Sequence, residues 1–413
     1  MPEMEILVST ALLSVGNPEQ IAIAPSGGRT DTRDVKEVIN ILFMIDELVE
    51  MGGAERAFMR LIRDLPSRFR ATAITFRANL SPHLRATFPC PLEVIPLGRT
   101  YDMNALRVGR RLRNYIRQHN INMVHTFFET SDLWGGLIVK SVPGVIHISS
   151  RRDMGILRST KHRIAYRYLG CMAKRIVTVS DRVRTWCIEA DRLPANRVTT
   201  VYNGVDDLLP TTLSRATARQ KLGLADNTHT LVVTTVGHVR KVKGFDLLIR
   251  AAAQVVLSFP DIIFLFVGDV HEPDHLVELE QLVTSLSLQD HIRFCGPTEE
   301  VASILIASDV FVLPSRSEGM SNALIEAMMC ALPCVATDVG GNREAIANDV
   351  NGYLIASESV DAVAHALSVL LRDPELRRRM GTEGRRIFLN RFNQASMING
   401  MVEVYERALG ERQ

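Results

Sequence analysis

Short, uninterrupted apolar runs alternate along this chain with longer segments of helical periodicity. The apolar runs predict buried strands of parallel sheet at 38–45, 71–76, 92–95, 123–126, 145–148 and 175–179, and again at 231–236, 262–267, 291–295, 308–313 and 333–337. Between them, apolar residues spaced three and four positions apart predict helices, which end in a helical tail at 360–409. This alternation is typical of parallel sheets that helices cover on both faces, so we expect an α/β fold.

The series of strands is interrupted once, at residues 201–210 (VYNGVDDLLP), where an Asn-Gly turn precedes Pro210. Because 413 residues exceed the size at which a single core stops growing, we predict two Rossmann-like domains at 38–203 and 204–385, with parallel sheets facing across a cleft. Such a cleft is a usual place for a ligand. Residues 386–413 are predicted as a C-terminal helix, and the polar, turn-rich residues 1–37 as a poorly ordered N-terminal extension.

The segment 315–332 (SRSEGMSNALIEAMMCAL) follows the predicted strand at 308–313 and contains two glutamates. Ligands of open α/β sheets bind outside the carboxyl ends of the strands. Gly319 allows a close backbone turn, and Ser321 and Asn322 are helix caps whose following N–H groups favour an anion, most simply a phosphate. The helix amino-terminus favours ionised carboxylates, so Glu318 and Glu326 suit the hydroxyls of a sugar and a ribose better than the acid and base of a glycosidase. The spacing alone is equally compatible with Glu326 as a solvated helix charge.

A basic loop follows the first strand of the second series, in TVGHVRKVKGF at 235–245. His238, Arg240, Lys241 and Lys243 gather there before a helix, and such a group would neutralise a diphosphate. In isolation a basic loop is more often solvated surface. Here the loop belongs to the same predicted domain as the two glutamates, which favours a shared anion site.

A literal HExxH motif occurs as His271, Glu272 and His275. A zinc protease needs both histidines on one continuous helix, but Pro273 lies between them and is tolerated only where a helix begins. We therefore expect a helix that begins at Pro273 and no zinc site. The sequence also lacks a DxD motif, and no metal or other cofactor is expected.

Charge and hydropathy narrow the classes of partner. A net charge of +2 argues against nucleic-acid binding. The helix predicted at 104–118 and the segment 151–167 are rich in arginine, which is typical of solvated faces and also of surfaces that contact anionic lipid. Glu3 and Glu5 stand where a signal peptide is basic, and no apolar run spans a bilayer. We expect a cytoplasmic protein, with peripheral contact at the inner face of the cell membrane as a hypothesis.

Four segments together resemble family 4 of the retaining, nucleotide-sugar-dependent glycosyltransferases. They are GGAERA at 52–57, NGVD at 203–206, VGHVRKVKGFD at 236–246 and SEGMSNALIEAMMCALPCVATDVGGNREAI at 317–346. The resemblance covers about residues 38–410 and implies a GT-B fold. It further implies that 38–203 bind the acceptor, that 204–385 bind the nucleotide sugar, and that the last helix crosses back to the first domain.

The same resemblance implies roles for individual residues. It assigns Lys243 to the donor diphosphate, Glu326 to the nucleotide ribose, and Glu318 to the hydroxyls of the transferred sugar as a catalytic residue. Backbone N–H groups of the turn would cradle the phosphates, and the glycine loop would approach the donor from the facing domain. These groups lie in Gly319, Met320, Ser321, Asn322 and Ala323, and in Gly52 and Gly53.

Two positions depart from the family pattern. His238 stands where the family commonly has arginine, and Arg240 is the candidate to supply the missing charge. Where many members have two histidines at the end of a strand, this chain has His125, and Phe127 takes the second place. We predict His125 as a catalytic residue that touches acceptor or sugar; a buried, hydrogen-bonded core histidine is an equally compatible interpretation.

The implied activity is transfer of a hexose, with retention, from a nucleotide diphosphate sugar, a UDP-sugar by resemblance, to a hydroxyl of a glycan or lipid-linked acceptor. Polysaccharide or cell-envelope synthesis is the implied pathway. Two alternatives are a catalytically idle GT-B module that serves a partner as regulatory subunit, and a GT-B sugar-nucleotide epimerase without an acceptor. The sequence leaves the sugar, the base, the acceptor and the linkage open.

Overall fold

The computed structural model describes residues 37–48, 52–77, 82–155, 160–207, 209, 213–224 and 229–411. Residues 38–413 form one compact unit. The predicted N-terminal extension, apart from Glu37, lies outside the described residues.

The first half of the compact unit is built on a sheet of seven parallel strands in the order β3-β2-β1-β4-β5-β6-β7. The strands are β1 (Ile39–Ile45), β2 (Phe69–Thr75), β3 (Leu92–Val94), β4 (Met123–Phe127), β5 (Ile146–Arg151), β6 (Arg175–Thr178) and β7 (Val198–Thr200). Strands β4, β5 and β6 are buried at every position, as expected for strands with helices on both faces.

The second half repeats this order in a sheet of six parallel strands, β10-β9-β8-β11-β12-β13. The strands are β8 (Leu231–Val236), β9 (Ile262–Val267), β10 (Ile292–Gly296), β11 (Val310–Leu313), β12 (Cys334–Thr337) and β13 (Gly352–Ile355). The two parallel sheets confirm the predicted class, an α/β protein with two Rossmann-like units.

Helices connect the strands in both halves. In the first half they are α1 (Gly53–Arg63), α2 (Pro82–Ala86), α3 (Met103–Gln118), α4 (Gly136–Lys140) after a π-helical turn (Ser131–Gly135), α5 (Thr160–Leu169) and α6 (Asp181–Ala190). In the second half they are α7 (Arg215–Lys221), α8 (Phe245–Val255), α9 (Pro273–Ser285), α10 (Val301–Ala307), α11 (Asn322–Met329), α12 (Asn342–Ala345), α13 (Val360–Arg372) and α14 (Pro374–Ile387), followed by a π-helical turn (Phe388–Phe392) and α15 (Gln394–Gly410).

The structure corrects the prediction at the ends of each half. Strands β7 and β13, each at an edge of its sheet, are absent from the prediction. The predicted helical tail is three helices. It breaks where Pro374 begins α14 and where Asn393 caps α15 by accepting a hydrogen bond from Ser396 N at 2.8 Å, since proline starts a helix well but interrupts one.

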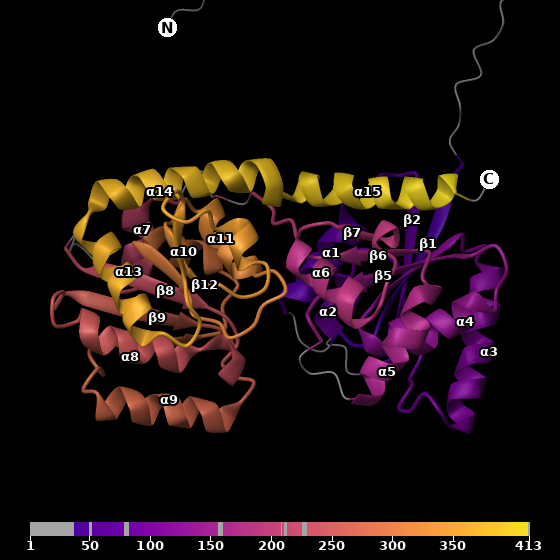
Figure 1. Ribbon diagram of the computed structural model, residues 1–413, viewed down its shortest axis with the longest axis horizontal. Helices are drawn as coiled ribbons and strands as arrows, with labels where there is room; N and C mark the ends of the chain where they lie inside the picture. Colours follow the sequence, from indigo (N-terminus) through magenta and orange to yellow (C-terminus); the bar gives the residue numbers. More distant parts are fainter. Residues whose placement is uncertain are drawn as a thin grey trace, which may run out of the picture. The chain divides into compact units, whose positions relative to one another are not determined.

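The last helix packs against the first half. The apolar side of α15, which includes Met401, Val404 and Tyr405, joins the core that β1 and α1 form around Phe43 and Phe58. In Figure 1 the yellow helix α15 lies beside the strands of the first sheet, while α14 lies beside elements of the second. The core of the first half is therefore completed by residues from the end of the chain.

In each sheet the direction of strand addition reverses between two central strands, β1 and β4 in the first and β8 and β11 in the second. Ligands of doubly wound sheets bind at these points, outside the carboxyl ends of the strands. Gly52 and Gly53 follow β1 at the start of α1, His238 and Lys243 lie between β8 and α8, and Glu318 lies between β11 and α11. The candidate residues thus follow the strands on which a ligand is expected.

Candidate functional site

A cleft of about 480 Å³ is lined by residues from both halves. Ten of the thirteen predicted site residues line it: Gly52, Gly53, His238, Lys243, Glu318, Met320, Ser321, Asn322, Ala323 and Glu326. Arg240, Gly319 and His125 are not among the lining residues. The structure therefore brings the two predicted halves of the site together, while the binding role of each residue stays a prediction.

The amino-terminus of α11 forms one wall of the cleft. Ser321 is its N-cap, and the side-chain oxygen accepts a hydrogen bond from Leu324 N at 3.3 Å. The helix begins at Asn322, so of the two predicted caps Ser321 is the N-cap and Asn322 is the first helical residue. N–H groups at the start of a helix lack intrahelical acceptors and carry the positive end of the helix dipole, so this wall is suited to an anion.

Lys243 and Glu318 meet in an ion pair beside this wall. Lys243 Nζ lies 2.7 Å from Glu318 Oε1, and Ser315 Oγ donates to the same oxygen at 2.7 Å. The Glu318 side chain is 9% exposed and that of Lys243 is 22% exposed, so solvent screens the pair poorly. The cation assigned to the diphosphate and the carboxylate assigned to the sugar hydroxyls therefore orient each other.

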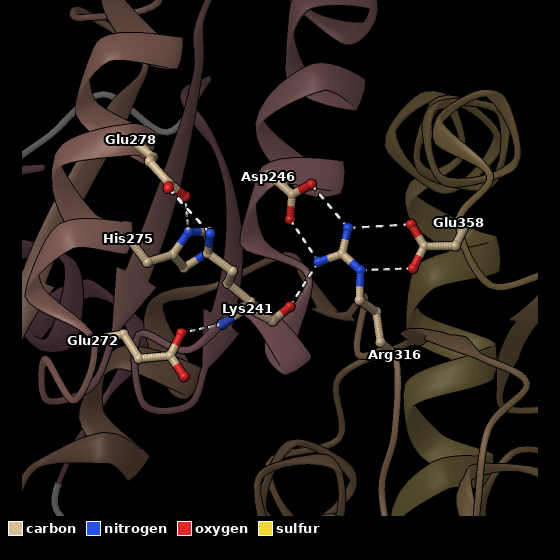
Figure 2. A network of polar contacts seen from close by, with 7 residues as sticks. All are labelled: Lys241, Asp246, Glu272, His275, Glu278, Arg316 and Glu358. Atoms are coloured by element: carbon tan, nitrogen blue, oxygen red, sulfur yellow. Dashed lines mark hydrogen bonds and ion pairs between the residues drawn. The ribbon is translucent and has the colours of Figure 1, made fainter. Parts of the chain in front are cut away.

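Arg316 fixes the two loops that carry this pair. Its guanidinium forms two hydrogen bonds to Asp246, at 2.8 and 2.9 Å, and two to Glu358, at 2.6 and 3.1 Å. A further N–H donates to the carbonyl of Lys241 at 2.6 Å. Figure 2 shows Arg316 between the two carboxylates, with the Lys241 carbonyl beside it. Planar bidentate pairing of this kind restricts geometry as well as adding energy, so Arg316 ties the turn before Lys243 to the loop before Glu318.

Glu326 lies in the second turn of α11 and faces α1 of the other half. Its Oε1 is 3.7 Å from Arg60 Nη2, and both side chains are largely buried. Burial raises the pKa of Glu326, and the nearby charges of Arg60 and Arg56 act in the opposite direction. Arg60 also lies 3.3 Å from Asp206. The carboxylate assigned to the ribose thus lies near a cation from the other half.

A chain of hydrogen bonds joins the two walls directly. Asn322 Nδ2 donates to the carbonyl of Gly53 at 2.8 Å, and Asn203 Nδ2 donates to Asn322 Oδ1 at 2.8 Å. Arg152 Nη2 donates to Asn203 Oδ1 at 2.8 Å. A Cβ atom at Gly319 would overlap the carbonyl oxygen of Arg152. Gly319 therefore serves the close approach of the two halves, although it does not line the cleft itself.

His238 lies in the cleft with a histidine from the HExxH segment. The His238 and His271 rings stack with centroids 3.8 Å apart and an interplanar angle of 26°. Arg240 Nη2 is 2.7 Å from His271 Nδ1. Arg240 therefore contacts His271, which lines the cleft, but does not line the cleft itself. In this arrangement Arg240 can supply the charge missing at position 238 only through His271.

His125 is fully buried in β4. Its Nδ1 is 2.8 Å from the Tyr405 hydroxyl and its Nε2 is 2.8 Å from Ser150 Oγ. Burial is the main cause that lowers the pKa of His125, so the ring is neutral. These surroundings match the alternative interpretation, a buried and hydrogen-bonded core histidine. They do not support the prediction that His125 is a catalytic residue.

Several lining residues are not assigned to the site by the sequence. They include Arg56, Arg152, Asn203, Asp269, His271 and Thr298. Arg56 and Asn203 stand within the GGAERA and NGVD segments, so the motifs contained a signal for them. Arg152 comes from a segment interpreted only as a basic surface, and its position in the cleft depends on contacts between the halves.

The two histidines of the HExxH motif have separate surroundings. Helix α9 begins at Pro273, as predicted, with the proline in its first turn. His271 stacks in the cleft, whereas His275 is buried on α9 with its Nδ1 2.9 Å from Glu278. Among the residues that the structure describes, no group of three or more His, Cys, Asp or Glu side chains is arranged to hold a metal ion.

The fold and the cleft together define a class of protein. The amino-terminus of α11, Lys243, Glu318 and Glu326 lie together in one cleft between two Rossmann-like halves. Residues 214–387 match the profile described as glycosyl transferases group 1, and residues 51–207 match that of glycosyltransferase family 4. The two matches together cover well over half of the chain. The protein belongs to the family 4 glycosyltransferases of GT-B fold.

Characterised relatives show what the family does elsewhere. The chain is 31% identical over 212 residues to N-acetyl-alpha-D-glucosaminyl L-malate synthase of Bacillus anthracis, a match that spans 51% of this chain and 54% of that protein. It is 26% identical over 304 residues to UDP-Gal:alpha-D-GlcNAc-diphosphoundecaprenol alpha-1,3-galactosyltransferase of Escherichia coli, which spans 71% of this chain and 77% of that protein.

A solved structure supports the fold. HepE of Anabaena, determined in complex with UDP, superposes with a TM-score of 0.79 at 22% identity, covering 89% of this chain and all (100%) of that chain. At this identity the similarity concerns the fold.

Proposed function

We propose that the protein is a retaining hexosyltransferase that uses a nucleotide diphosphate sugar, with UDP as the nucleotide. The observation that carries the proposal is the meeting of Lys243, Glu318 and Glu326 with the amino-terminus of α11 in one cleft, opposite Gly52 and Gly53. The Escherichia coli relative is named for a UDP-Gal donor and Anabaena HepE was solved with UDP, which supports the choice of nucleotide.

In this proposal, the main catalytic task of the site is to stabilise the charge that develops on the leaving diphosphate. The N–H groups of α11 and Lys243 supply fixed donors where that charge develops, and preorganised donors of this kind usually contribute more to catalysis than any other single effect. Glu326 accepts from the ribose hydroxyls, and Glu318 accepts from the sugar hydroxyls while it keeps Lys243 in place. A front-face route, in which the leaving phosphate helps to deprotonate the acceptor, accounts for retention without a metal.

We assign the donor to the second half, 204–385, and the acceptor to the first, 38–203. The acceptor is proposed to be a hydroxyl of a glycan or a lipid-linked glycan in polysaccharide or cell-envelope synthesis. The Escherichia coli relative, whose named acceptor is a diphosphoundecaprenol-linked sugar, supports this class.

Contact with a membrane is proposed for the surface formed by α3 and α5. Large apolar side chains stand exposed there beside cations: Tyr101, Met103, Leu106, Ile164 and Tyr168 with Arg107, Arg110, Lys161, Arg163 and Arg167. Apolar and basic groups on one helix are typical of surfaces that lie on anionic lipid. Among the described ranges, no helix combines the length and the apolar character that crossing a bilayer requires.

The membrane contact is tested by flotation with phosphatidylglycerol vesicles and with phosphatidylcholine vesicles. We expect the protein to float with the anionic vesicles at low salt and less so as salt rises, because salt screens surface charge. Absence of flotation at low salt contradicts the contact.

Thermal-shift measurements with a panel of nucleotide sugars test the donor proposal. A ligand that binds only the folded state raises the melting temperature by mass action, so a UDP-sugar should stabilise the wild-type protein. Glu326→Ala should weaken this stabilisation, whereas Glu375→Ala on the exposed surface of α14 should not. No shift with any nucleotide sugar contradicts the proposal. Binding without turnover favours an idle module, and interconversion of the donor sugar without an acceptor favours an epimerase.

A further inference from the structure

The glutamate of the HExxH segment reaches the loop that carries Lys243. Glu272 Oε2 accepts a hydrogen bond from Lys241 N at 2.9 Å, and Lys243 lines the cleft two residues further on. We propose that Glu272 is a positioning residue for donor binding, which fixes the turn that holds Lys243 in place. The proposal rests on the proposed transferase function. Glu272 is not among the residues that line the cleft, so it acts on the donor through Lys243.

The Glu272 side chain is not used by its own helix. Glu272 is the N-cap residue of α9, but its side chain forms no capping hydrogen bond. Its backbone carbonyl begins the helix by accepting from His275 N at 3.1 Å. The carboxylate is directed instead to the amide of Lys241, 31 positions earlier in the chain, and Figure 2 shows the two residues side by side. Removal of the side chain therefore leaves the start of α9 intact.

The turn that the carboxylate contacts leads directly to Lys243. A 3-10 helical turn spans Lys241–Lys243. Lys243 N donates to the carbonyl of Arg240 at 2.9 Å, and Gly244 N donates to the carbonyl of Lys241 at 3.2 Å. Because these hydrogen bonds join the turn internally, a shift of the Lys241 amide also moves the backbone of Lys243.

Contacts to the backbone of residue 241 set the position of this turn. The N–H donates to Glu272, and the carbonyl accepts from Arg316 Nη1 at 2.6 Å. Both contacts persist whatever side chain stands at position 241. Lys241 Nζ also lies 3.1 Å from Glu278, but these two side chains are 64% and 54% exposed, and exposed ion pairs contribute little. An amide donor to a carboxylate forms a stronger hydrogen bond than one between neutral groups, so Glu272 supplies a substantial part of the restraint.

The segment around Glu272 also holds the start of the loop. Glu272 N donates to the carbonyl of Val239 at 3.1 Å, and Val239 N donates to the carbonyl of Asp269 at 2.8 Å. Arg240 Nη2 donates to His271 Nδ1 at 2.7 Å. The backbone pairing of β8 with β9 thus continues beyond the strands, which places the Glu272 carboxylate beside the Lys241 amide.

The position of Lys243 decides how well it can serve a diphosphate. Lys243 Nζ lies 2.7 Å from Glu318 Oε1, and both residues line the cleft. A charge that is fixed before the reaction costs no reorganisation when charge develops on the leaving group. A turn that is free to move loses part of this advantage, so removal of the Glu272 carboxylate should weaken the contact between Lys243 and the phosphates.

The experiment compares the affinities of the full chain for UDP and for UMP by calorimetry. Glu272→Ala should lower the affinity for UDP about 5-fold and that for UMP less than about 2-fold, because Lys243 is assigned to the diphosphate and one charge-assisted hydrogen bond is lost. Damage to the fold would instead weaken both ligands equally. An equal loss for UDP and UMP, or no loss for UDP, overturns the proposal.

Two further variants of α9 make the test specific. Glu272→Gln keeps an acceptor oxygen of similar reach, so it should recover most of the affinity for UDP. Glu280→Ala removes an exposed carboxylate from the same helix and should bind UDP like the wild type. If Glu272→Gln is as weak as Glu272→Ala, the negative charge and not the hydrogen bond is responsible, and the positioning role is wrong.

A double-mutant cycle with Lys243→Ala tests whether Glu272 acts through Lys243. In the Lys243→Ala background, Glu272→Ala should change the affinity for UDP by less than about 2-fold, because a positioning residue has no effect once the group that it positions is absent. The same loss in both backgrounds would show that Glu272 affects UDP by another route, which overturns the proposal.

The two proposals fail in different ways. If neither UDP nor a nucleotide sugar binds the wild-type protein, the transferase proposal fails, and the positioning role of Glu272 fails with it. If Lys243→Ala weakens UDP binding but Glu272→Ala binds UDP like the wild type, the positioning role alone is refuted.

Discussion

The two halves of the molecule share a strand order but place their polar groups differently. The second half keeps a largely apolar interior and carries its candidate chemistry on loops, as with Lys243 and Glu318. The first half buries ionisable groups in and beside its sheet, among them His125, His147 and the pair of Asp132 with Arg151. One topology thus carries candidate site residues on loops in the second half and a buried polar network in the first half.

The difference affects how each half responds to change. Replacement of a loop residue such as Lys243 leaves the packing of the hydrophobic core in place, although it removes the cation that pairs with Glu318. When a buried polar group is removed, its partners stay buried without a hydrogen bond. The resulting loss of stability is larger than the net contribution of the hydrogen bonds themselves. We therefore expect substitutions in the second half to alter activity first, and changes in the first half to alter stability first.

The largest effect is expected for Lys243→Ala. Loss of a preorganised cation at the leaving group should lower kcat/KM by about 10²- to 10³-fold. Lys241→Ala is the matched control, because Lys241 lies on the same turn but pairs with Glu278 on the surface. Steady-state kinetics with a UDP-sugar distinguish the two. Near wild-type turnover by Lys243→Ala contradicts the assignment to the diphosphate.

A smaller effect is expected for Gly319→Ala, at a close approach of the two halves. The new Cβ overlaps the carbonyl oxygen of Arg152. Such overpacking typically lowers the free energy of unfolding by about 1 to 3 kcal/mol. Affinity for UDP, measured by calorimetry, should fall by roughly 10-fold because the closed cleft is disfavoured. Gly98→Ala, with open space around its Cβ, should bind UDP like the wild type. If Gly319→Ala and the wild type bind UDP with equal affinity, the close approach of Gly319 to Arg152 does not support the cleft.

Acid should destabilise the first half. Burial, with the charge of Arg151, lowers the pKa of His147 to about 3, and burial lowers the pKa of His125. Unfolded histidines bind protons below about pH 6.5, so stability present above that pH is lost as the pH falls toward the folded pKa values. Burial raises the pKa of Asp46 to about 6, which opposes the trend below pH 6.

Urea unfolding at pH 7.0 and 5.5, followed by tryptophan fluorescence, measures this loss. Both tryptophans, Trp134 and Trp186, belong to the first half. We expect the free energy of unfolding to fall by about 1 to 2 kcal/mol between the two pH values. His147→Gln should reduce the difference, whereas His365→Gln, at an exposed histidine of α13, should not. A free energy of unfolding that rises at the lower pH would show that the buried histidines do not dominate.

The smallest effect is expected for Arg316→Lys. Lysine keeps the charge but cannot form the paired hydrogen bonds to Asp246 and Glu358. The loops that carry Lys243 and Glu318 should loosen. The KM for the donor should rise about 3- to 5-fold, and kcat should fall by a smaller factor. Arg343→Lys, which loses a surface pair with Asp338, is the control. An unchanged donor KM contradicts a positioning role for Arg316.

The same contrast explains what the sequence could predict. In the second half, residue type and position after a strand are enough to place Lys243, Glu318 and Glu326 in one cleft, because parallel strands bring their carboxyl ends together. The apolar runs predict strands β8 (231–236) and β9 (262–267) at their observed bounds. Local pattern and site geometry agree there.

In the first half, the important facts depend on distant contacts. Whether His125 faces a ligand or the core depends on Tyr405, which is 280 residues away, and no local pattern contains that information. Arg152 and Asn203 enter the cleft through a hydrogen bond between residues 51 positions apart. A similar limit applies to Arg240 in the second half, whose contact with His271 is made by a loop from another strand.

The packing of α15 on the first sheet also has a consequence for biosynthesis. The core around Phe43 includes Met401, Val404 and Tyr405, so the half that leaves the ribosome first lacks part of its interior until these residues have been made. The second half has its strands and most of its helices by residue 387, and domains generally fold as units during synthesis. We therefore expect the later half to reach its native state before the earlier one, which must wait, partly open, for the chain to return.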